Sequence, residues 1–286
     1  MCVASVPRIS IVTPSFNQGH FIEESIRSVL TQDYPDVEYF VVDGGSSDNS
    51  VEIIRKYADR LTWWVSEKDK GQSDAINKGF RRSTGDILAW LNSDDLYCPG
   101  ALVLVARFFR QHPECDAVIG DQESIDKDGR MLDLKKCVPV TFRRSLYSAC
   151  GVPQPSTFFT RRAWKITGEV DTTLQYQMDF EFFLRMQARG VRFGMIPERL
   201  ARFRLHGDSK TVSQYDNLVW AANRKIQDQY FRVPLHGASR EIYRQGMKWL
   251  YRLQIYGLRM ATRGVVVPFR STRARKQALA ASSGAQ

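Results

Sequence analysis

The sequence reads Ile87-Leu88-Ala89-Trp90-Leu91-Asn92-Ser93-Asp94-Asp95 where an apolar run gives way to two adjacent carboxylates, and this stretch decides which fold the chain can adopt. The apolar run is typical of a buried strand. Neighbouring carboxylates repel each other and lose solvation on burial, so such a pair persists most easily where a cation shares it. Mg2+ takes one or two carboxylates together with water and substrate phosphates. The pair therefore indicates a metal held against a phosphorylated ligand; the alternative is a cap for a helix that starts near Pro99.

Short apolar runs and helical patterns alternate on both sides of this stretch, over residues 9–120. Strands are predicted over residues 9–12, 38–42, 62–65, 87–91 and 117–119, and helices over 21–30, 48–57, 73–82 and 101–109. This alternation predicts an α/β fold with a mostly parallel sheet and helices on both faces. Ligands of such sheets bind at the carboxyl ends of the strands. Pro14, Asp43, Glu67 and the Asp94–Asp95 pair lie at four of these ends, which predicts a binding crevice.

The pattern changes after residue 120. The sequence Asp126-Lys127-Asp128-Gly129 is typical of a hairpin turn, so residues 121–160 are predicted to be irregular or antiparallel. A further amphipathic helix is predicted over residues 179–188. The polar loop 207–213 then marks a boundary before a basic tail.

Composition narrows the class of protein. A chain of 286 residues with a hydrophobic fraction of 43% suits one large globular domain, or one domain with an appendage. Five cysteines without C-x-x-C spacing favour reduced thiols in a cytosolic compartment over a disulfide framework or a zinc site. The N-terminus lacks a signal-peptide pattern, and no uncharged apolar stretch reaches roughly 18 residues, so no membrane-spanning helix is expected.

The tail carries the whole net charge of the chain. Residues 214–286 contain thirteen Lys and Arg against three acids, a local net of 13 − 3 = +10, which equals the net charge of +10 for all 286 residues. On a helical wheel at about 100° per residue, six cations of residues 240–263 share one arc. These are Arg240, Arg244, Lys248, Arg252, Arg259 and Arg263. The opposite arc holds Ile242, Trp249, Leu250, Leu253 and Met260. This pattern is typical of a helix that lies on an anionic membrane surface.

Two alternatives stay open for this helix. Its apolar arc could dock on the rest of the protein and leave the basic arc in solvent. The basic arc could instead bind nucleic acid, which we do not expect but which strong salt dependence would indicate.

Seven segments, in this order, resemble those of the family 2 glycosyltransferases with a GT-A fold. They are Val12–Asn17, Val42–Asp48, Gly71–Phe80, Trp90–Asp95, Gln154–Phe159, Met178–Glu181 and Arg204–Ser209. The resemblance covers roughly residues 8–210 and is nearest to bacterial enzymes that build surface polysaccharides from nucleotide sugars. It implies a GT-A domain over residues 1–213, with a nucleotide-sugar half at 8–120 and an acceptor half at 121–213. Residues 214–286 then form a basic helical appendage.

The resemblance also implies a donor site. Phe16 would stack on the nucleotide base, although a core phenylalanine is the alternative. Asp43 would accept a hydrogen bond from the base edge, which favours uracil or thymine, with a turn residue as the alternative. Asp94 would contact the ribose or the sugar. The other donor-site residues that the resemblance implies are Pro14, Asn17, Gln72, Asp74, Asn77 and Asn92.

The remaining roles concern metal and catalysis. By resemblance, Asp95 is the expected ligand of Mg2+ or Mn2+, and His206 ligates the metal, donates to phosphate or is structural. Asp179 is the expected base that takes the proton of the acceptor hydroxyl, with Glu181 as the alternative. The N-terminus of a helix favours the ionised carboxylate, so we expect a low pKa for Asp179. Residues expected to face the acceptor are Gln154, Ser156 and Thr157.

The sequence thus predicts a metal-dependent, inverting glycosyltransferase that uses a nucleotide-diphosphate sugar, with a UDP-sugar favoured, and a lipid-linked or oligosaccharide acceptor. We expect it in the cytoplasm, peripherally bound to the inner face of the plasma membrane through residues 240–263. The alternatives are a nucleotidyltransferase, or a non-catalytic membrane or nucleic-acid binding module on a transferase fold.

Overall fold

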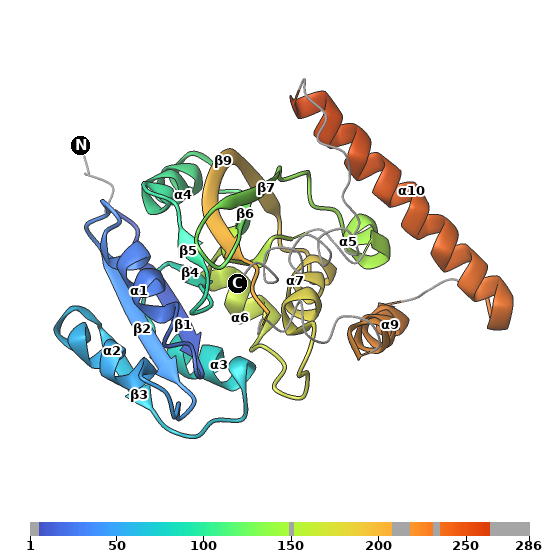
Figure 1. Ribbon diagram of the computed structural model, residues 1–286. Helices are drawn as coiled ribbons and strands as arrows, with labels where there is room; N and C mark the ends of the chain where they lie inside the picture. The colour runs from blue at the N-terminus through green and yellow to red at the C-terminus, as the bar shows by residue number, and fades with distance from the viewer. Residues whose placement is uncertain (1–5, 149–151, 208–217, 231–234, 264–286) are drawn as a thin grey trace.

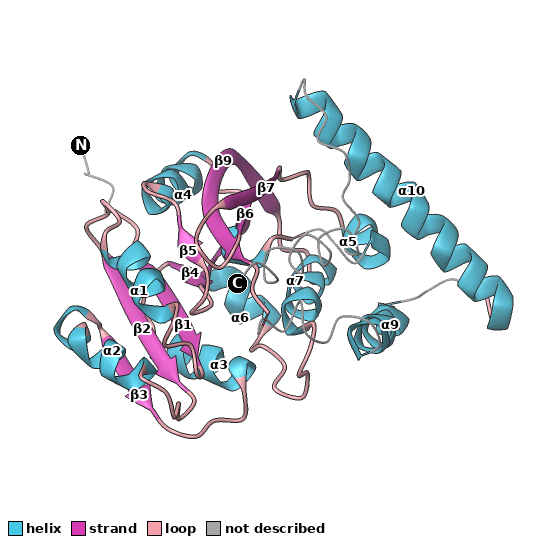
Figure 2. Ribbon diagram, in the orientation of Figure 1, coloured by secondary structure: helices cyan, strands magenta, loops and turns pink. Residues whose placement is uncertain are grey.

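The computed structural model describes residues 6–148, 152–207, 218–230 and 235–263. In this part of the chain a nine-stranded sheet is flanked by helices (Figures 1 and 2). The strands are β1 (Ile9–Ser15), β2 (Val37–Asp43), β3 (Trp63–Ser66), β4 (Ile87–Trp90), β5 (Leu96–Tyr97), β6 (Ala117–Ile125), β7 (Met131–Lys135), β8 (Thr157–Thr160) and β9 (Phe193–Arg204). The α-helices are α1 (Ile22–Leu30), α2 (Ser50–Lys56), α3 (Gln72–Arg82), α4 (Ala101–Gln111), α5 (Phe142–Ser148), α6 (Arg161–Thr167), α7 (Met178–Ala188), α9 (Leu218–Tyr230) and α10 (Gly237–Arg263). Two 3-10 turns are η1 (Ala58–Arg60) and η2 (Gln154–Ser156).

The first half of the sheet is parallel, as predicted. Strands β3, β2, β1 and β4 are neighbours in that order, and the three pairings among them are parallel. The register places Ser15 opposite Asp43, and Asp43 opposite Ser66. Because parallel strands in this register end together, the polar residues at their carboxyl ends lie along one edge of the sheet.

The second half of the sheet is mixed. Strand β8 lies antiparallel between β4 and β6, β6 runs parallel to β9, and β7 forms a hairpin with β6 across the predicted turn at residues 126–129. The sheet is therefore parallel over only part of its width. Strand β6 extends to Ile125, well beyond the predicted residues 117–119, because its polar side chains find partners. The Glu123 carboxylate, for example, pairs with Arg199 (2.6 Å) and Arg202 (2.9 Å).

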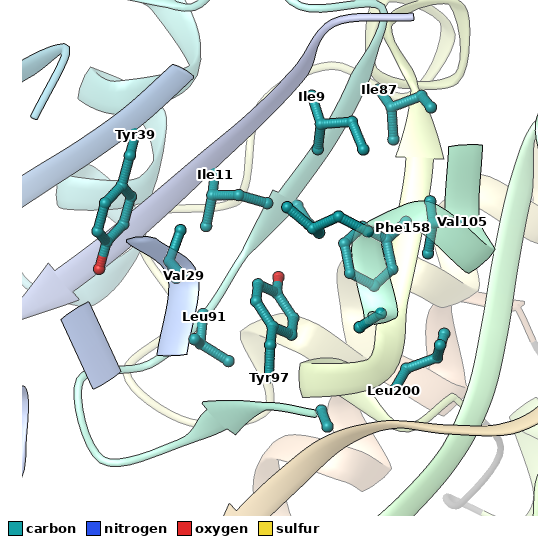
Figure 3. Packing of buried hydrophobic residues seen from close by; sticks show 14 of the residues in the cluster. Ile9, Ile11, Val29, Tyr39, Ile87, Leu91, Tyr97, Val105, Phe158 and Leu200 are labelled. Atoms are coloured by element: carbon teal, nitrogen blue, oxygen red, sulfur yellow. The ribbon is translucent and has the colours of Figure 1, made fainter. Parts of the chain in front are cut away.

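Helices cover both faces of the sheet, as predicted. Alternate residues of β1 point to opposite sides, so Ile9 and Ile11 join one buried cluster and Val12 joins another. The first cluster packs against α1, α2 and α4, and Figure 3 shows part of it around Tyr97 and Phe158. The second packs against α3, α6 and α7. The two clusters hold the strand ends of the site in fixed positions.

The last described helix, α10, packs beside α5 and α9 at the edge of the molecule (Figure 1). The Tyr147 ring of α5 stacks on Tyr251 with centroids 6.0 Å apart. Asp228 of α9 pairs with Arg240 (3.0 Å) and with the buried Arg244. Two cations of the predicted basic arc therefore face the protein.

The predicted apolar arc of α10 faces outward instead. Ile242 is 73% exposed, Trp249 63% and Leu253 65%. The alternative in which this arc docks on the rest of the protein is therefore wrong. Within the described residues, no helix has both the length and the apolar character needed to cross a membrane. The described part of the chain does not extend to residues 264–286 or to residues 208–213 of the predicted boundary loop. It also leaves out the side chains of Arg259, Met260 and Arg263.

Two helical glycines offer a matched test of how α3 packs on β1. A Cβ at Gly79 in α3 would lie 2.5 Å from Val12 Cγ1, whereas a Cβ at Gly246 in α10 would meet nothing within 4 Å. We expect Gly79→Ala to lower the free energy of unfolding by about 1–3 kcal/mol through overpacking. Gly246→Ala should raise it by about 0.5–1 kcal/mol, because alanine is the better helix former. Urea unfolding measures both, and equal destabilisation by the two changes would contradict the packing of α3 on β1.

Candidate active site

A chain of amide side chains joins the end of β4 to α3 and η2. Gln72 Nε2 donates to Asn92 Oδ1 (2.7 Å), and Asn92 Nδ2 donates to Gln154 Oε1 (3.0 Å). Gln154 Nε2 in turn donates to the main-chain oxygen of Trp90 (2.8 Å). Buried amides linked in this way polarise and orient one another. Three residues predicted from distant sequence segments are therefore brought together at one strand end.

The two carboxylates after β4 occupy different environments. Asp95 is fully buried, and its two oxygens accept hydrogen bonds from the main-chain nitrogen of Arg204 (3.0 Å) and from Asn92 Nδ2 (3.2 Å). Burial, and then the nearby charge of Asp94, raise the pKa of Asp95 well above its usual range. Asp94 is only partly buried, and its Oδ2 lies 3.0 Å from His206 Nε2. The carboxylate that is open to a ligand is therefore Asp94 rather than Asp95.

His206 and Asp94 form the group best suited to a divalent cation. The His206 ring is buried, 4.5 Å from the Phe21 ring, and its Nε2 faces the Asp94 carboxylate. One carboxylate and one imidazole fit an ion that takes its other ligands from phosphate oxygens and water. No cluster of three or more His, Cys, Asp or Glu side chains suited to a metal occurs in the described residues. A cation bound by this pair would therefore take its remaining ligands from substrate or water.

Asp43, at the end of β2, is fully buried and holds its own loop. Its Oδ2 accepts from the main-chain nitrogens of Gly45 (3.1 Å) and Ser46 (2.9 Å) and from Ser66 Oγ (2.7 Å). Its Oδ1 accepts from Ser46 Oγ (2.5 Å). These bonds use most of the carboxylate's hydrogen-bonding capacity. Asp43 is therefore a turn residue, which was the alternative interpretation of this position. A bound base would meet a carboxylate that is already fixed in place.

The residues after β1 are exposed beside this turn. Phe16 is 60% exposed, which rules out the alternative of a core phenylalanine. Asn17 has a positive φ of 52°, and its Oδ1 accepts from the main-chain nitrogen of Ser47 (2.9 Å). Pro14 pairs in register with Val42. An aromatic ring thus stands in solvent next to a fixed polar turn, which suits stacking on a flat ligand.

Asp69 is a carboxylate in this region that the sequence analysis missed. Its Oδ1 accepts from the main-chain nitrogen of Gly71 (2.8 Å), and a Cβ at Gly44 would lie 2.9 Å from its Oδ2. Burial raises the pKa of Asp69, and the charge of Asp43 adds to this effect. Asp69 lies in a charged run between two predicted elements, where such residues are normally solvated. Only the close approach to Gly44 distinguishes it.

Two predicted donor-site residues of α3 make structural contacts. Asn77 is fully buried, and its amide bonds to the main-chain oxygen (2.8 Å) and nitrogen (2.9 Å) of Val170. Asp74 accepts from the main-chain nitrogen of Lys70 (3.2 Å) and lies 3.5 Å from Lys78 Nζ. Asn77 therefore has no free group for a ligand, contrary to prediction, because the loop before α7 takes both ends of its amide.

Ser156 and Thr157 likewise differ from their predicted acceptor role. The hydroxyl of Ser156 donates to the main-chain oxygen of Gly120 (3.0 Å), and that of Thr157 donates to the oxygen of Pro153 (2.6 Å). Both side chains are buried. Their hydrogen bonds hold η2 against β6 and thereby fix Gln154. Of the three predicted acceptor residues, Gln154 is the one that belongs to the amide network.

Asp179 lies in the first turn of α7, beside the first turn of α3. The two turns meet where Ser73 Oγ lies 2.8 Å from Met178 Sδ, which puts Asp179 next to the segment that carries Gln72. Burial raises the pKa of Asp179, although the main-chain N–H of Phe180 opposes the shift. The expected low pKa is therefore wrong, because the loss of water outweighs the helix terminus here.

Glu181 is committed to an ion pair. Its two carboxylate oxygens accept from Arg185 Nε (2.8 Å) and Nη2 (2.9 Å), one helical turn away. Arg185 also donates to the main-chain oxygens of Thr167 (2.6 Å) and Glu169 (2.9 Å). The pair joins α7 to the end of α6. Among the described residues, no cationic side chain hydrogen-bonds to Asp179, the other candidate base.

Comparison with known proteins gives a family and a fold. The model described as Glycosyl transferase family 2 matches residues 10–167, more than half of the chain. A chondroitin synthase of Escherichia coli is 28% identical over 213 residues, which cover 74% of this chain and 31% of the synthase. An uncharacterized glycosyltransferase of Rickettsia typhi is 27% identical over 253 residues, which cover 82% of this chain and 77% of that protein. The chain thus spans about a third of the first relative.

Solved structures share the fold. The crystal structure of Staphylococcus aureus TarS 1-349 in complex with UDP-GlcNAc has a TM-score of 0.65 and 18% identity, covering 89% of this chain and 74% of that one. A mannosyltransferase from Pyrobaculum calidifontis in complex with GDP-Man and Mn2+ has a TM-score of 0.57 and 17% identity, covering 98% and 81%. The predicted GT-A fold is thereby confirmed.

Proposed function

The chain belongs to glycosyl transferase family 2, and on that premise we propose that it is a metal-dependent, inverting glycosyltransferase. It moves a sugar from a nucleotide-diphosphate donor to a hydroxyl of a lipid-linked or oligosaccharide acceptor, in the synthesis of a cell-surface polysaccharide such as O-antigen or capsule. The observation that carries this proposal is the facing pair of Asp94 and His206, 3.0 Å apart at the strand ends. Family membership argues against the nucleotidyltransferase alternative.

The base of the donor is proposed to lie on Phe16, between the turn of Asp43 and the carboxylate of Asp69. A carboxylate oxygen accepts from the imide N–H of uracil, and the exposed Phe16 ring offers a stacking surface. A related fold binds UDP-GlcNAc and another binds GDP-Man, so the fold itself allows either base. Acidic groups at the base end suit the imide N–H of uracil, and UDP is the donor nucleotide that we propose.

Asp94 and His206 are the proposed ligands of Mg2+ or Mn2+, in place of the predicted Asp95. The ion would stabilise the negative charge that develops on the departing diphosphate. Asp95 has a structural role, because its buried carboxylate accepts a hydrogen bond that joins the loop after β4 to the end of β9. Gln72 and Asn92 hold the same loop from the side of α3.

Asp179 is the proposed base. Its carboxylate takes the proton from the acceptor hydroxyl as that oxygen attacks the anomeric carbon and the bond to the diphosphate breaks. The raised pKa brings this carboxylate closer to the working pH and so makes it a stronger base than an exposed aspartate. Glu181 is unsuited to the role, since proton transfer to it would disrupt its pair with Arg185.

Isothermal titration of UDP, GDP and dTDP, each with and without Mn2+, tests the donor site. We expect UDP to bind most tightly of the three, and more tightly with Mn2+ than without it, and Asp94→Asn to abolish the metal-dependent part. Asp95→Asn should instead lower the free energy of unfolding, because it disturbs a fully buried carboxylate that accepts two hydrogen bonds. Circular dichroism separates the two effects. Absence of nucleotide binding by the wild-type protein would contradict the proposal, as would full metal-dependent binding by Asp94→Asn.

The pH profile of kcat/KM tests the base. Asp179 must be ionised to accept a proton, so activity should fall as the pH drops through its pKa, and the raised pKa puts this acidic limb above the usual range for aspartate. Asp179→Asn should lower kcat by roughly 100- to 10,000-fold and remove the limb. Glu181→Gln is the matched control on the same helix. If it lost the limb and Asp179→Asn kept it, the assignment would be reversed.

The proposed partner of α10 is an anionic membrane surface at the inner face of the plasma membrane, where a lipid-linked acceptor is reached. Ile242, Trp249 and Leu253 form an exposed apolar stripe, with Leu250 and Tyr256 beside them. Tryptophan and aliphatic side chains on one face of a helix, with cations at the flank, favour a lipid interface over an aqueous one. Arg252, exposed next to Leu253, is one such cation.

Vesicle sedimentation tests this surface. We expect the protein to bind vesicles of phosphatidylglycerol and phosphatidylcholine, and the double variant Trp249→Ser/Leu253→Ser to bind at least tenfold more weakly, since each buried apolar side chain contributes about 1.5–3 kcal/mol. Leu132→Ser is the matched control, because Leu132 is 51% exposed on β7, outside α10. Unchanged binding of the double variant, or an equal loss in the control, would sink the proposal.

A further inference from the structure

Arg204 is the most completely buried cation in the described part of the chain, and none of the roles proposed above uses its side chain. It is the last residue of β9, two positions before His206, and only 1% of its surface is exposed. Burying a guanidinium is unfavourable unless each of its N–H groups finds an acceptor. The acceptors that it finds belong to three separate segments around the site.

Each nitrogen of the Arg204 side chain bonds to a different segment. Nε donates to the main-chain oxygen of Asp94 (3.0 Å), and Nη1 donates to the main-chain oxygen of Lys127 in the β6–β7 turn (2.8 Å). Nη2 donates to the carboxylate of Glu24 in α1 (2.5 Å). A planar fork of this kind fixes direction as well as distance, which a lysine ammonium cannot do.

The guanidinium also reaches His206 through an aromatic ring. Its central carbon lies 5.0 Å from the centroid of Phe21, and the Phe21 ring lies 4.5 Å from the His206 ring. The main-chain nitrogen of Arg204 meanwhile donates to Asp95 Oδ1 (3.0 Å). One residue therefore contacts the backbone of Asp94 on one side and the ring that supports His206 on the other.

We propose that Arg204 is a positioning residue that sets the separation of Asp94 and His206 and thereby the affinity of the site for its divalent cation. The inference rests on the proposed function, because it takes this pair as the cation ligands. Arg204 touches neither the cation nor the donor and acts through the main chain of Asp94 and the Phe21 ring. Groups that orient metal ligands in this way typically change metal affinity by roughly 10- to 100-fold when they are altered.

The test compares Arg204→Lys with Arg202→Lys. Arg202 lies two residues earlier on the same strand, and its side chain, 42% exposed, pairs with the buried Glu123 rather than with Asp94, Phe21 or His206. It is therefore a matched control. Mn2+ binding is followed by electron paramagnetic resonance, and metal-free UDP binding by titration. We expect Arg204→Lys to weaken Mn2+ binding roughly 10- to 100-fold. Its metal-free UDP affinity should stay within about twofold, and Arg202→Lys should change neither.

A second readout does not depend on catalysis or on metal. The chain has four histidines, so the imidazole signals of 15N-histidine-labelled protein can be assigned with His206→Asn. In metal-free protein, Arg204→Lys should shift the His206 signal, and Arg202→Lys should not. An unshifted signal, or unchanged Mn2+ affinity in folded Arg204→Lys protein, would overturn the positioning role. A shifted signal in a protein that binds no Mn2+ even as wild type would overturn the proposed function, and with it the metal-tuning part of the inference.

Discussion

The buried carboxylate of Asp95 is the constraint on which the rest of the site depends. A fully buried carboxylate requires hydrogen-bond donors, and here they are the main-chain nitrogen of Arg204 and the amide of Asn92. The first of these bonds joins the loop after β4 to the end of β9, 109 residues further along the chain. His206, two residues beyond Arg204, is thereby brought beside Asp94. The juxtaposition of Asp94 and His206 is thus a consequence of the hydrogen bonds made by the buried Asp95.

Local sequence patterns predicted the first half of the fold and much less of the second. The alternation of Ile9, Ile11 and Val12 between two helix-covered faces is a local property, and it is visible in the sequence. The insertion of β8 between β4 and β6 depends on pairing with segments about 70 and about 40 residues away, for which no local signal exists. The polar stretch at the end of β6 concealed a strand, because Glu123 and its arginine partners meet only after folding.

The same limit applies to the site. The family resemblance pointed to Asp94, Gln72, Gln154 and His206. In the structure both glutamines bond to Asn92, and His206 faces Asp94. Spacing could not tell which polar side chains would turn inward. Asn77 and Ser156 carry groups as suitable for a ligand as those of Gln154, yet main-chain partners take them. Polar residues near a site are recruited both to bind and to hold the backbone, and only tertiary contacts separate the two uses.

The orientation of α10 follows from charge rather than from its apolar arc. The helical wheel separated the cationic and apolar arcs correctly, but it could not include Asp228, which lies on another helix. Turning the apolar arc inward would separate Arg244 from that carboxylate and would remove Tyr243, Met247 and Tyr251 from the cluster in which they pack. The ion pairs with Asp228 and the packing of these three side chains therefore fix the orientation in which Trp249 and Leu253 face outward.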